Sequence, residues 1–162
     1  MARRVFFSFH YQGDILRVGQ VRNSWVTQDR TTANFWDSAA WESIKRKGER
    51  AVHNWIDEQL KGTSVTVVLI GAQTSNRDHV IYEIKKSHEL GKGILGIYIH
   101  NLVDLNGEQT AKGSNPLDRI YYESAGKKIY LSKVYPTYDW LRDDGRNNIG
   151  RWIEKAANEA GY

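Results

Sequence analysis

The run Val65-Thr66-Val67-Val68-Leu69-Ile70, between Ser64 and Gly71, decides the fold class. All of its residues except Thr66 are aliphatic, and apolar side chains do not alternate with polar ones. A continuous apolar run of this length is typical of a strand that is buried on both faces, as the strands of parallel sheets are. The sequence therefore predicts a central parallel strand over residues 65–70.

Similar patterns repeat on both sides of this strand. Arg4–Phe9 and Ile94–Ile99 read as further buried strands, and Lys128–Leu131 as an edge strand. Apolar residues at helical spacing predict four helices, which are Ile15–Val26, Glu49–Lys61, Asp78–Leu90 and Asn147–Ala160. Strands that alternate with amphipathic helices indicate an α/β fold, an open parallel sheet covered by helices on both faces. Residues 27–43 show no sustained period and fit a loop or a short second strand, and residues 101–117 form a long loop.

Length and composition favour one globular domain over residues 1–162. Hydrophobic residues make up 40% of the chain and charged residues 26%, and no internal repeat or linker divides it. The chain has no cysteine, which excludes disulfides, thiolate metal sites and thiol nucleophiles. Without disulfides that need an oxidising compartment, we expect a cytoplasmic protein.

The net charge and the length of the apolar runs limit the kinds of partner that we expect. The formal net charge is +4, but the basic residues are scattered, so nucleic acid is an unlikely partner. A basic nucleic-acid binder is therefore the weakest alternative. The apolar runs are far shorter than the roughly 20 residues that span a bilayer, so no membrane partner is expected.

The predicted topology indicates where a ligand would bind, although it does not indicate which reaction takes place there. Ligands of open parallel sheets bind at the carboxyl ends of the strands, which here are followed by residues 8–13, 71–78 and 100–104. No GxGxxG motif follows the first strand, and the chain lacks a P-loop, a GxSxG motif and an HExxH motif. Rossmann redox chemistry and P-loop ATP hydrolysis are thereby disfavoured, and no metal site is expected.

One carboxylate occupies a suggestive position. Glu83 lies in the predicted helix that follows Gly71, roughly 110° from the centre of the face formed by Val80, Ile81 and Ile84. This flank position allows the side chain to lean over the cleft. It equally allows a solvated glutamate that pairs with Lys86 or with the helix N-terminus. The pattern alone leaves both readings open.

Several blocks of sequence, taken together, resemble a known family. The blocks are Phe6-Phe7-Ser8-Phe9-His10-Tyr11, Val21-Arg22-Asn23-Ser24-Trp25-Val26, Val80-Ile81-Tyr82-Glu83-Ile84 and Ile97-Tyr98-Ile99-His100-Asn101. In this order they resemble the TIR-like proteins of the Thoeris anti-phage defence system, of the ThsB type. The resemblance covers roughly residues 3–105. It departs from the usual TIR pattern at residues 76–80, where a tryptophan often precedes the glutamate.

The resemblance implies a flavodoxin-like fold of TIR type and an enzyme that cleaves the N-glycosidic bond of NAD+. Nicotinamide is released, and a cyclic or conjugated ADP-ribose signal diffuses to a separate effector and activates it. NAD+ is then a substrate, and no cofactor is expected. A phage-derived trigger and a homo-oligomer are further partners in this reading. The alternative is a non-catalytic TIR-like signalling module that binds a partner or a nucleotide.

The resemblance also assigns roles to residues. Glu83 is the expected catalytic carboxylate, since a charge beside the ribose stabilises the oxocarbenium ion that forms as nicotinamide leaves. The expected substrate-binding residues are Ser8, Phe9, His10, Asp14, Asn23, Phe35 and Trp36. Ser8, Phe9 and His10 follow the first strand and would contact the ribose or the diphosphate, while Phe35 or Trp36 would stack on a base or on nicotinamide. Asp14 fits a helix cap as well as a ligand contact.

Overall fold

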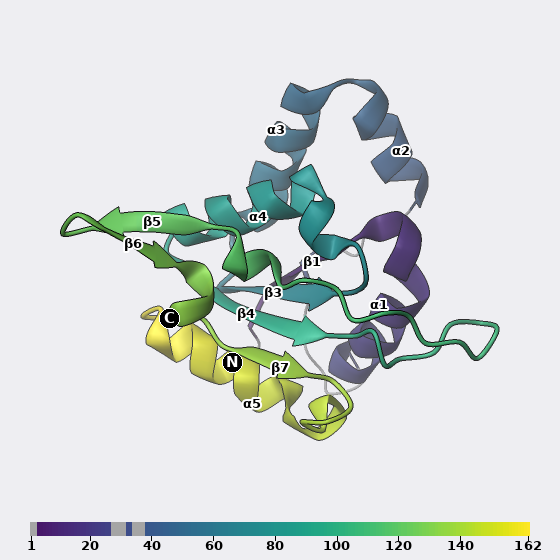
Figure 1. Ribbon diagram of the computed structural model, residues 1–162. Helices are drawn as coiled ribbons and strands as arrows, with labels where there is room; N and C mark the ends of the chain where they lie inside the picture. Colours follow the sequence, from purple (N-terminus) through teal and green to yellow (C-terminus); the bar gives the residue numbers. More distant parts are fainter. Residues whose placement is uncertain (1–2, 27–31, 34–37) are drawn as a thin grey trace.

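The computed structural model describes residues 3–26, 32–33 and 38–162, with side chains for 3–25 and 41–162. Its centre is a sheet of five strands in which every neighbouring pair is parallel (Figure 1). In spatial order the strands are β2 (Thr32–Ala33), β1 (Val5–Ser8), β3 (Val65–Ile70), β4 (Gly93–Tyr98) and β7 (Thr137–Asp139). The predicted central strand therefore lies in the middle of the sheet.

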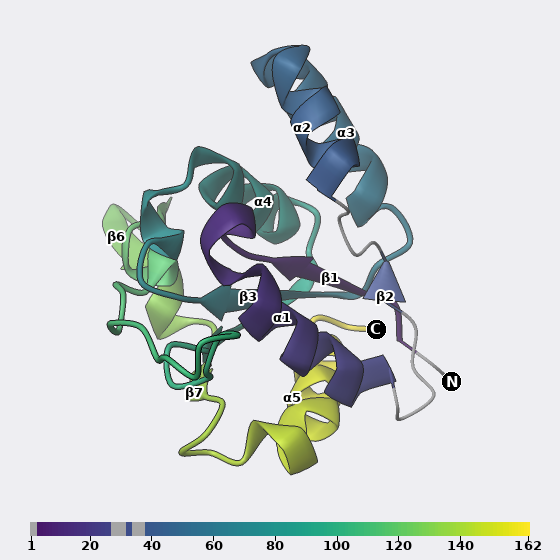
Figure 2. The ribbon, with the colours of Figure 1, turned by 90° about the vertical axis from the view of Figure 1, so that its right-hand side faces the viewer.

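Helices cover both faces of this sheet, which confirms the flavodoxin-like α/β class. The helices α1 (Tyr11–Val26) and α5 (Gly145–Glu159) lie on one face, and α4 (Asp78–Glu89) lies on the other. Beside α4, the helices α2 (Ser38–Arg46) and α3 (Glu49–Leu60) pack on each other and project away from the sheet (Figure 2). None of the helices in the described ranges is long and apolar enough to cross a bilayer.

Strand β3 connects the two halves of the core. All of its residues are buried, and successive side chains point to opposite faces. Leu69 belongs to the hydrophobic cluster that includes Ile153 of α5, whereas Ile70 belongs to the cluster that includes Ile84 of α4. Burial on both faces is the reason why this strand reads as a continuous apolar run rather than an alternating one.

The segment after β4 departs from the prediction. Residues 127–130 are not an edge strand of the main sheet; they form β6 (Lys127–Tyr130), which pairs antiparallel with β5 (Tyr121–Ser124) in a separate hairpin. Ala125 and Gly126 both have positive φ, as a tight hairpin turn requires. The edge strand beside β4 is β7, which is too short to show a period in the sequence.

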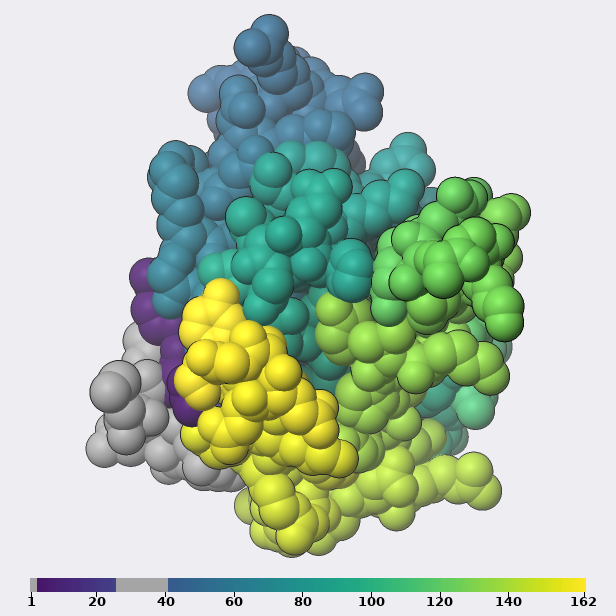
Figure 3. All heavy atoms as spheres, turned by 90° about the vertical axis from the view of Figure 1, so that its left-hand side faces the viewer, coloured from purple at the N-terminus to yellow at the C-terminus, as the bar shows by residue number. Residues whose placement is uncertain are grey.

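Three other differences bear on the site. Helix α1 begins at Tyr11, four residues before the predicted Ile15, and α2 occupies part of the segment that showed no period. Short 3-10 turns occur at η1 (Thr74–Asn76), η2 (Pro116–Asp118) and η3 (Leu131–Lys133). Figure 3 shows the side of the molecule at which the parallel strands begin. The carboxyl ends of the strands lie on the opposite side.

Candidate functional site

Glu83 is buried inside the protein. It lies in the second turn of α4, and its side chain is fully inaccessible to solvent. Neither carboxyl oxygen has a hydrogen-bond partner among the described residues. The reading of Glu83 as a solvated surface glutamate is therefore wrong, and the side chain faces inward, toward the end of β1.

Burial controls the charge of this carboxyl group. Removal from water raises the pKa of Glu83 well above its ordinary value of 4.5, and nearby Ser8 lowers the pKa only in part. Ser8 is the last residue of β1, it is also fully buried, and its Oγ makes no hydrogen bond of ordinary geometry within the described chain. The two carboxyl oxygens of Glu83 and the Oγ of Ser8 thus lie close together at the carboxyl end of β1, where the hydroxyl and the carboxyl group interact with each other.

His79 closes this group on one side. It precedes Glu83 by one helical turn, and its Nε2 atom lies 3.0 Å from the carbonyl oxygen of Phe9 and 4.0 Å from Oε1 of Glu83. Burial lowers the pKa of His79 to about 4, so the ring is neutral near pH 7. The ring also packs against Trp41 of α2, with 4.9 Å between the ring centroids. His79 and Trp41 are site residues that the sequence analysis did not single out.

The residues predicted to surround Glu83 separate into distinct groups. Ser8 lies beside the carboxyl group, Phe9 accepts the hydrogen bond from His79, and the charge of His10 acts on His79. Asn23 does not join them: it is exposed on α1 and lines a hollow of about 680 Å³ together with Trp140. Phe35 and Trp36 lie outside the described residues.

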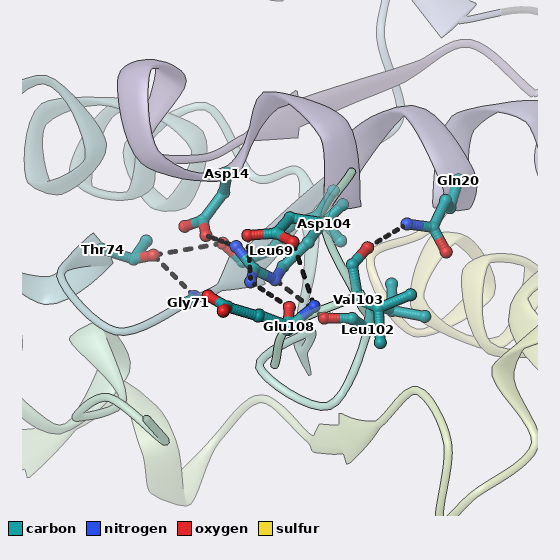
Figure 4. Close-up of polar contacts among 10 residues, drawn as sticks. Asp14, Gln20, Leu69, Gly71, Thr74, Leu102, Val103, Asp104 and Glu108 are labelled. Carbon is teal, nitrogen blue, oxygen red and sulfur yellow. Dashed lines mark hydrogen bonds and ion pairs between the residues drawn. The ribbon is translucent and has the colours of Figure 1, made fainter. Parts of the chain in front are cut away.

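Asp14 belongs to a neighbouring buried cluster, which Figure 4 shows in detail. It lies in the first turn of α1, and its carboxyl group packs so closely on Gly71, at the end of β3, that a Cβ atom there would collide with it. Arg17 Nη1 lies 3.6 Å from Asp14, and burial raises the pKa of this carboxyl while Arg17 and Thr74 oppose the rise. Asp14 is therefore inside the helix and not the cap residue before it.

Arg17 connects this cluster to the long loop after β4. Its guanidinium donates to the carbonyl oxygen of Leu102 at 2.8 Å and to that of Glu108 at 3.0 Å, and Asp104 lies 3.9 Å away (Figure 4). Arg17 is almost completely buried. The Asp14–Arg17 pair therefore fixes α1 against the loops that follow β3 and β4, at the same edge of the sheet as Glu83.

The cleft that the sequence analysis expected beside Glu83 does not coincide with either of two hollows between described residues. One of these hollows is the one beside Asn23, and the other, of about 390 Å³, lies between α4 and α5 and is lined by His88 and Lys92. Neither is lined by Glu83, Ser8 or His79. Within the ranges described, no three histidine, aspartate or glutamate side chains gather as a metal site.

The buried carboxyl leads to a prediction about stability. A carboxyl group whose pKa is raised on folding binds its proton more tightly in the folded protein, so the free energy of unfolding falls as the pH rises above 4.5 toward the folded-state pKa. Glu83→Gln removes this titration. We expect the difference in free energy of unfolding between Glu83→Gln and wild type to grow in favour of the variant between pH 4.5 and 8.

Urea unfolding at a series of pH values measures this difference. Glu89→Gln is the matched control, since Glu89 is an exposed residue of the same helix and its neutralisation should leave the pH dependence unchanged. A difference between Glu83→Gln and wild type that stays constant with pH would contradict the assignment of a raised pKa to Glu83.

Comparison with known proteins gives two results. Residues 6–104 match the sequence model of the family described as "Thoeris protein ThsB, TIR-like domain". A protein of Bacillus cereus (strain MSX-D12), named "Putative cyclic ADP-D-ribose synthase ThsB1", is 39% identical over 191 aligned residues, which cover 94% of this chain and 100% of that protein. The family match spans more than half of the chain, and the relative spans nearly all of it. The chain therefore belongs to the ThsB family of TIR-like proteins of the Thoeris system.

Proposed function

We propose that this protein cleaves the N-glycosidic bond of NAD+, releases nicotinamide and converts the ADP-ribose part into a cyclic or conjugated signal in defence against phage. The name of the Bacillus cereus relative, "Putative cyclic ADP-D-ribose synthase ThsB1", supports this class of reaction. The observation that carries the proposal is the fully buried carboxyl group of Glu83, which makes no hydrogen bond of ordinary geometry within the described chain, beside the equally buried hydroxyl group of Ser8.

Such a group is costly to the fold. A buried polar group without a hydrogen bond costs about 1–3 kcal/mol, and a carboxylate costs more. A leucine or methionine would fill the same volume without that cost. Strongly perturbed carboxyl groups of this kind are typical of catalytic and ligand-binding sites. The position at the carboxyl end of a parallel strand is the ordinary place for a ligand in this class of fold.

The chemistry needs a single carboxylate. Nicotinamide is attached to the ribose as a pyridinium cation, so it leaves with the bonding electron pair as a neutral base and needs no proton. Positive charge then develops on the ribose, where an ionised Glu83 stabilises it, and the same carboxylate accepts hydrogen bonds from the ribose hydroxyls. The cation of the substrate favours the ionised form of Glu83, opposing the effect of burial on its pKa.

Exclusion of water supports a cyclic or conjugated product. In ring closure, a nucleophilic atom of the same ADP-ribose attacks the anomeric carbon and loses its proton, so water must be kept from that carbon. The complete burial of Glu83 and Ser8 suits such a site.

We further propose that the signal diffuses to a separate effector and activates it. A phage-derived trigger and self-assembly of the chain accompany activation in this proposal.

A non-catalytic signalling module is the second candidate function. The observation that favours it is the complete burial of Glu83, whose side chain is closed off from solvent in the described structure. In this alternative, Glu83 would never meet a dinucleotide, and the chain would act through contacts with a partner.

Mass spectrometry of small molecules from cells that express the chain, with and without phage challenge, distinguishes the two. We expect a new ADP-ribose-related mass in challenged cells with the wild type and with Glu89→Gln, and none with Glu83→Gln. The same new mass with Glu83→Gln would overturn the role of Glu83. No new mass with any of the three proteins, together with intact defence, would favour the signalling module.

A further inference from the structure

His79 makes a contact that joins α4 to the end of β1. A carbonyl oxygen only accepts hydrogen bonds, so the 3.0 Å contact between Nε2 of His79 and the oxygen of Phe9 requires the proton to be on Nε2. That proton is directed to Phe9, and Glu83 Oε1, at 4.0 Å, is beyond hydrogen-bond distance. His79 is therefore a donor to the backbone and not a partner of the carboxyl group.

The ring of His79 is held in one orientation. Its side chain is 12% exposed. The indole of Trp41, itself 4% exposed, packs against the ring at an interplanar angle of 56°. A second helix, α2, thus also contacts the imidazole. Because the ring is neutral, the hydrogen bond adds direction without adding a buried charge.

The carbonyl group of Phe9 lies just outside the strand pairing in which the residues before it take part. The paired part of β1 ends at Ser8, which is opposite Val68 of β3, so Phe9 lies one residue beyond the ladder. The sheet itself therefore does not fix the Phe9 carbonyl group. His79 fixes it from α4, one turn away from Glu83 on the same helix.

We propose that His79 is a positioning residue of the NAD+ reaction: its bond to Phe9 sets the distance between Ser8, at the end of β1, and the carboxyl group of Glu83. This inference rests on the proposed function, because it assigns His79 a part in that reaction. The two side chains must contact one ribose from two different elements, and the His79–Phe9 bond is a hydrogen bond that joins α4 to the chain at the end of β1. Displacement of a reacting group by about 1 Å can cost about a hundredfold in rate.

The test compares two substitutions at one position. Glutamine places an N–H group near the position of Nε2 and can donate to Phe9, whereas leucine fills a similar volume and cannot. In extracts of phage-challenged cells, at equal amounts of folded protein, we expect His79→Leu to lower the kcat of nicotinamide release by about a hundredfold, with KM changed by less than about threefold. His79→Gln should restore most of the rate.

A matched control lies on the same helix. His88 is also partly buried and hydrogen-bonded, in its case to the hydroxyl group of Tyr135 at 2.7 Å, and it lies away from Glu83. His88→Leu therefore removes a comparable contact without touching the site, and its kcat should equal that of the wild type. Equal kcat for wild type and His79→Leu would overturn the inference and leave the proposed function intact.

Hydrogen exchange tests the same inference without activity. In the purified protein, we expect the peptide that spans residues 6–14 to exchange about five- to tenfold faster in His79→Leu than in wild type, the effect of one lost hydrogen bond. His79→Gln should exchange like the wild type. If no protein releases nicotinamide, the proposed function fails. Unchanged exchange in His79→Leu would refute the positioning role in that case as well.

Discussion

Glu83→Gln is expected to lower the rate of nicotinamide release from NAD+ by about a thousandfold, the loss typical for removal of a main source of charge stabilisation in a buried site. Glutamine keeps the shape of the side chain and can still contact the ribose hydroxyls. It carries no negative charge, so it cannot stabilise the oxocarbenium ion. Because substrate contacts remain, we expect the loss in kcat and only a small change in KM.

The rate is measured as nicotinamide formed per amount of folded protein in extracts of phage-challenged cells, over a range of NAD+ concentrations. Glu89→Gln, at the exposed end of the same helix, controls for the loss of one negative charge and should retain the full rate. A Glu83→Gln protein that releases nicotinamide within tenfold of the wild-type rate would show that another group stabilises the transition state.

The sequence predicted the elements whose burial leaves a regular pattern. Strand β3 is buried on both faces and shows a continuous apolar run, whereas helix α4 buries one face and shows a helical period, and these are the patterns from which each was predicted. Strand β7 has three partly buried residues and no period, and the exposed hairpin β5–β6 has the composition of an edge strand. Strand β7 is fixed by its pairing with β4, which is far away in the chain, and the local pattern of β6 does not show whether it pairs with β5 or with the main sheet.

The candidate site was predictable only in part, for a related reason. Glu83 and Ser8 could be placed at one edge of the sheet from the order of strands and helices alone. Helical periodicity put Glu83 at a flank, but it could not show that the carboxyl is fully buried or that Trp41 packs on the neighbouring His79. The spacing of His79, one turn before Glu83, was a signal available in the sequence. The position of Trp41 was not, because its segment has no period.

Arg17→Met is expected to lower the free energy of unfolding by about 3–5 kcal/mol, the usual cost of breaking a buried ion pair by removal of one partner. Methionine replaces the aliphatic part of the arginine side chain but not the guanidinium. The change leaves the buried carboxyl group of Asp14 without its positive partner and removes the hydrogen bonds to the carbonyl oxygens of Leu102 and Glu108. Equilibrium urea unfolding at pH 7 measures the loss.

A double-variant cycle with Asp14→Asn tests the reason for that loss. If the unpaired carboxylate is the main cost, Arg17→Met should destabilise the Asp14→Asn protein less than it destabilises the wild type. The loss in the single variant should also be smaller at pH 4 than at pH 8, because burial raises the pKa of Asp14 and low pH neutralises it. Arg151→Met, at an exposed position of α5, should change the free energy of unfolding by less than about 0.5 kcal/mol. A similarly small effect for Arg17→Met would mean that the Asp14–Arg17 pair does not hold α1 against the loop after β4.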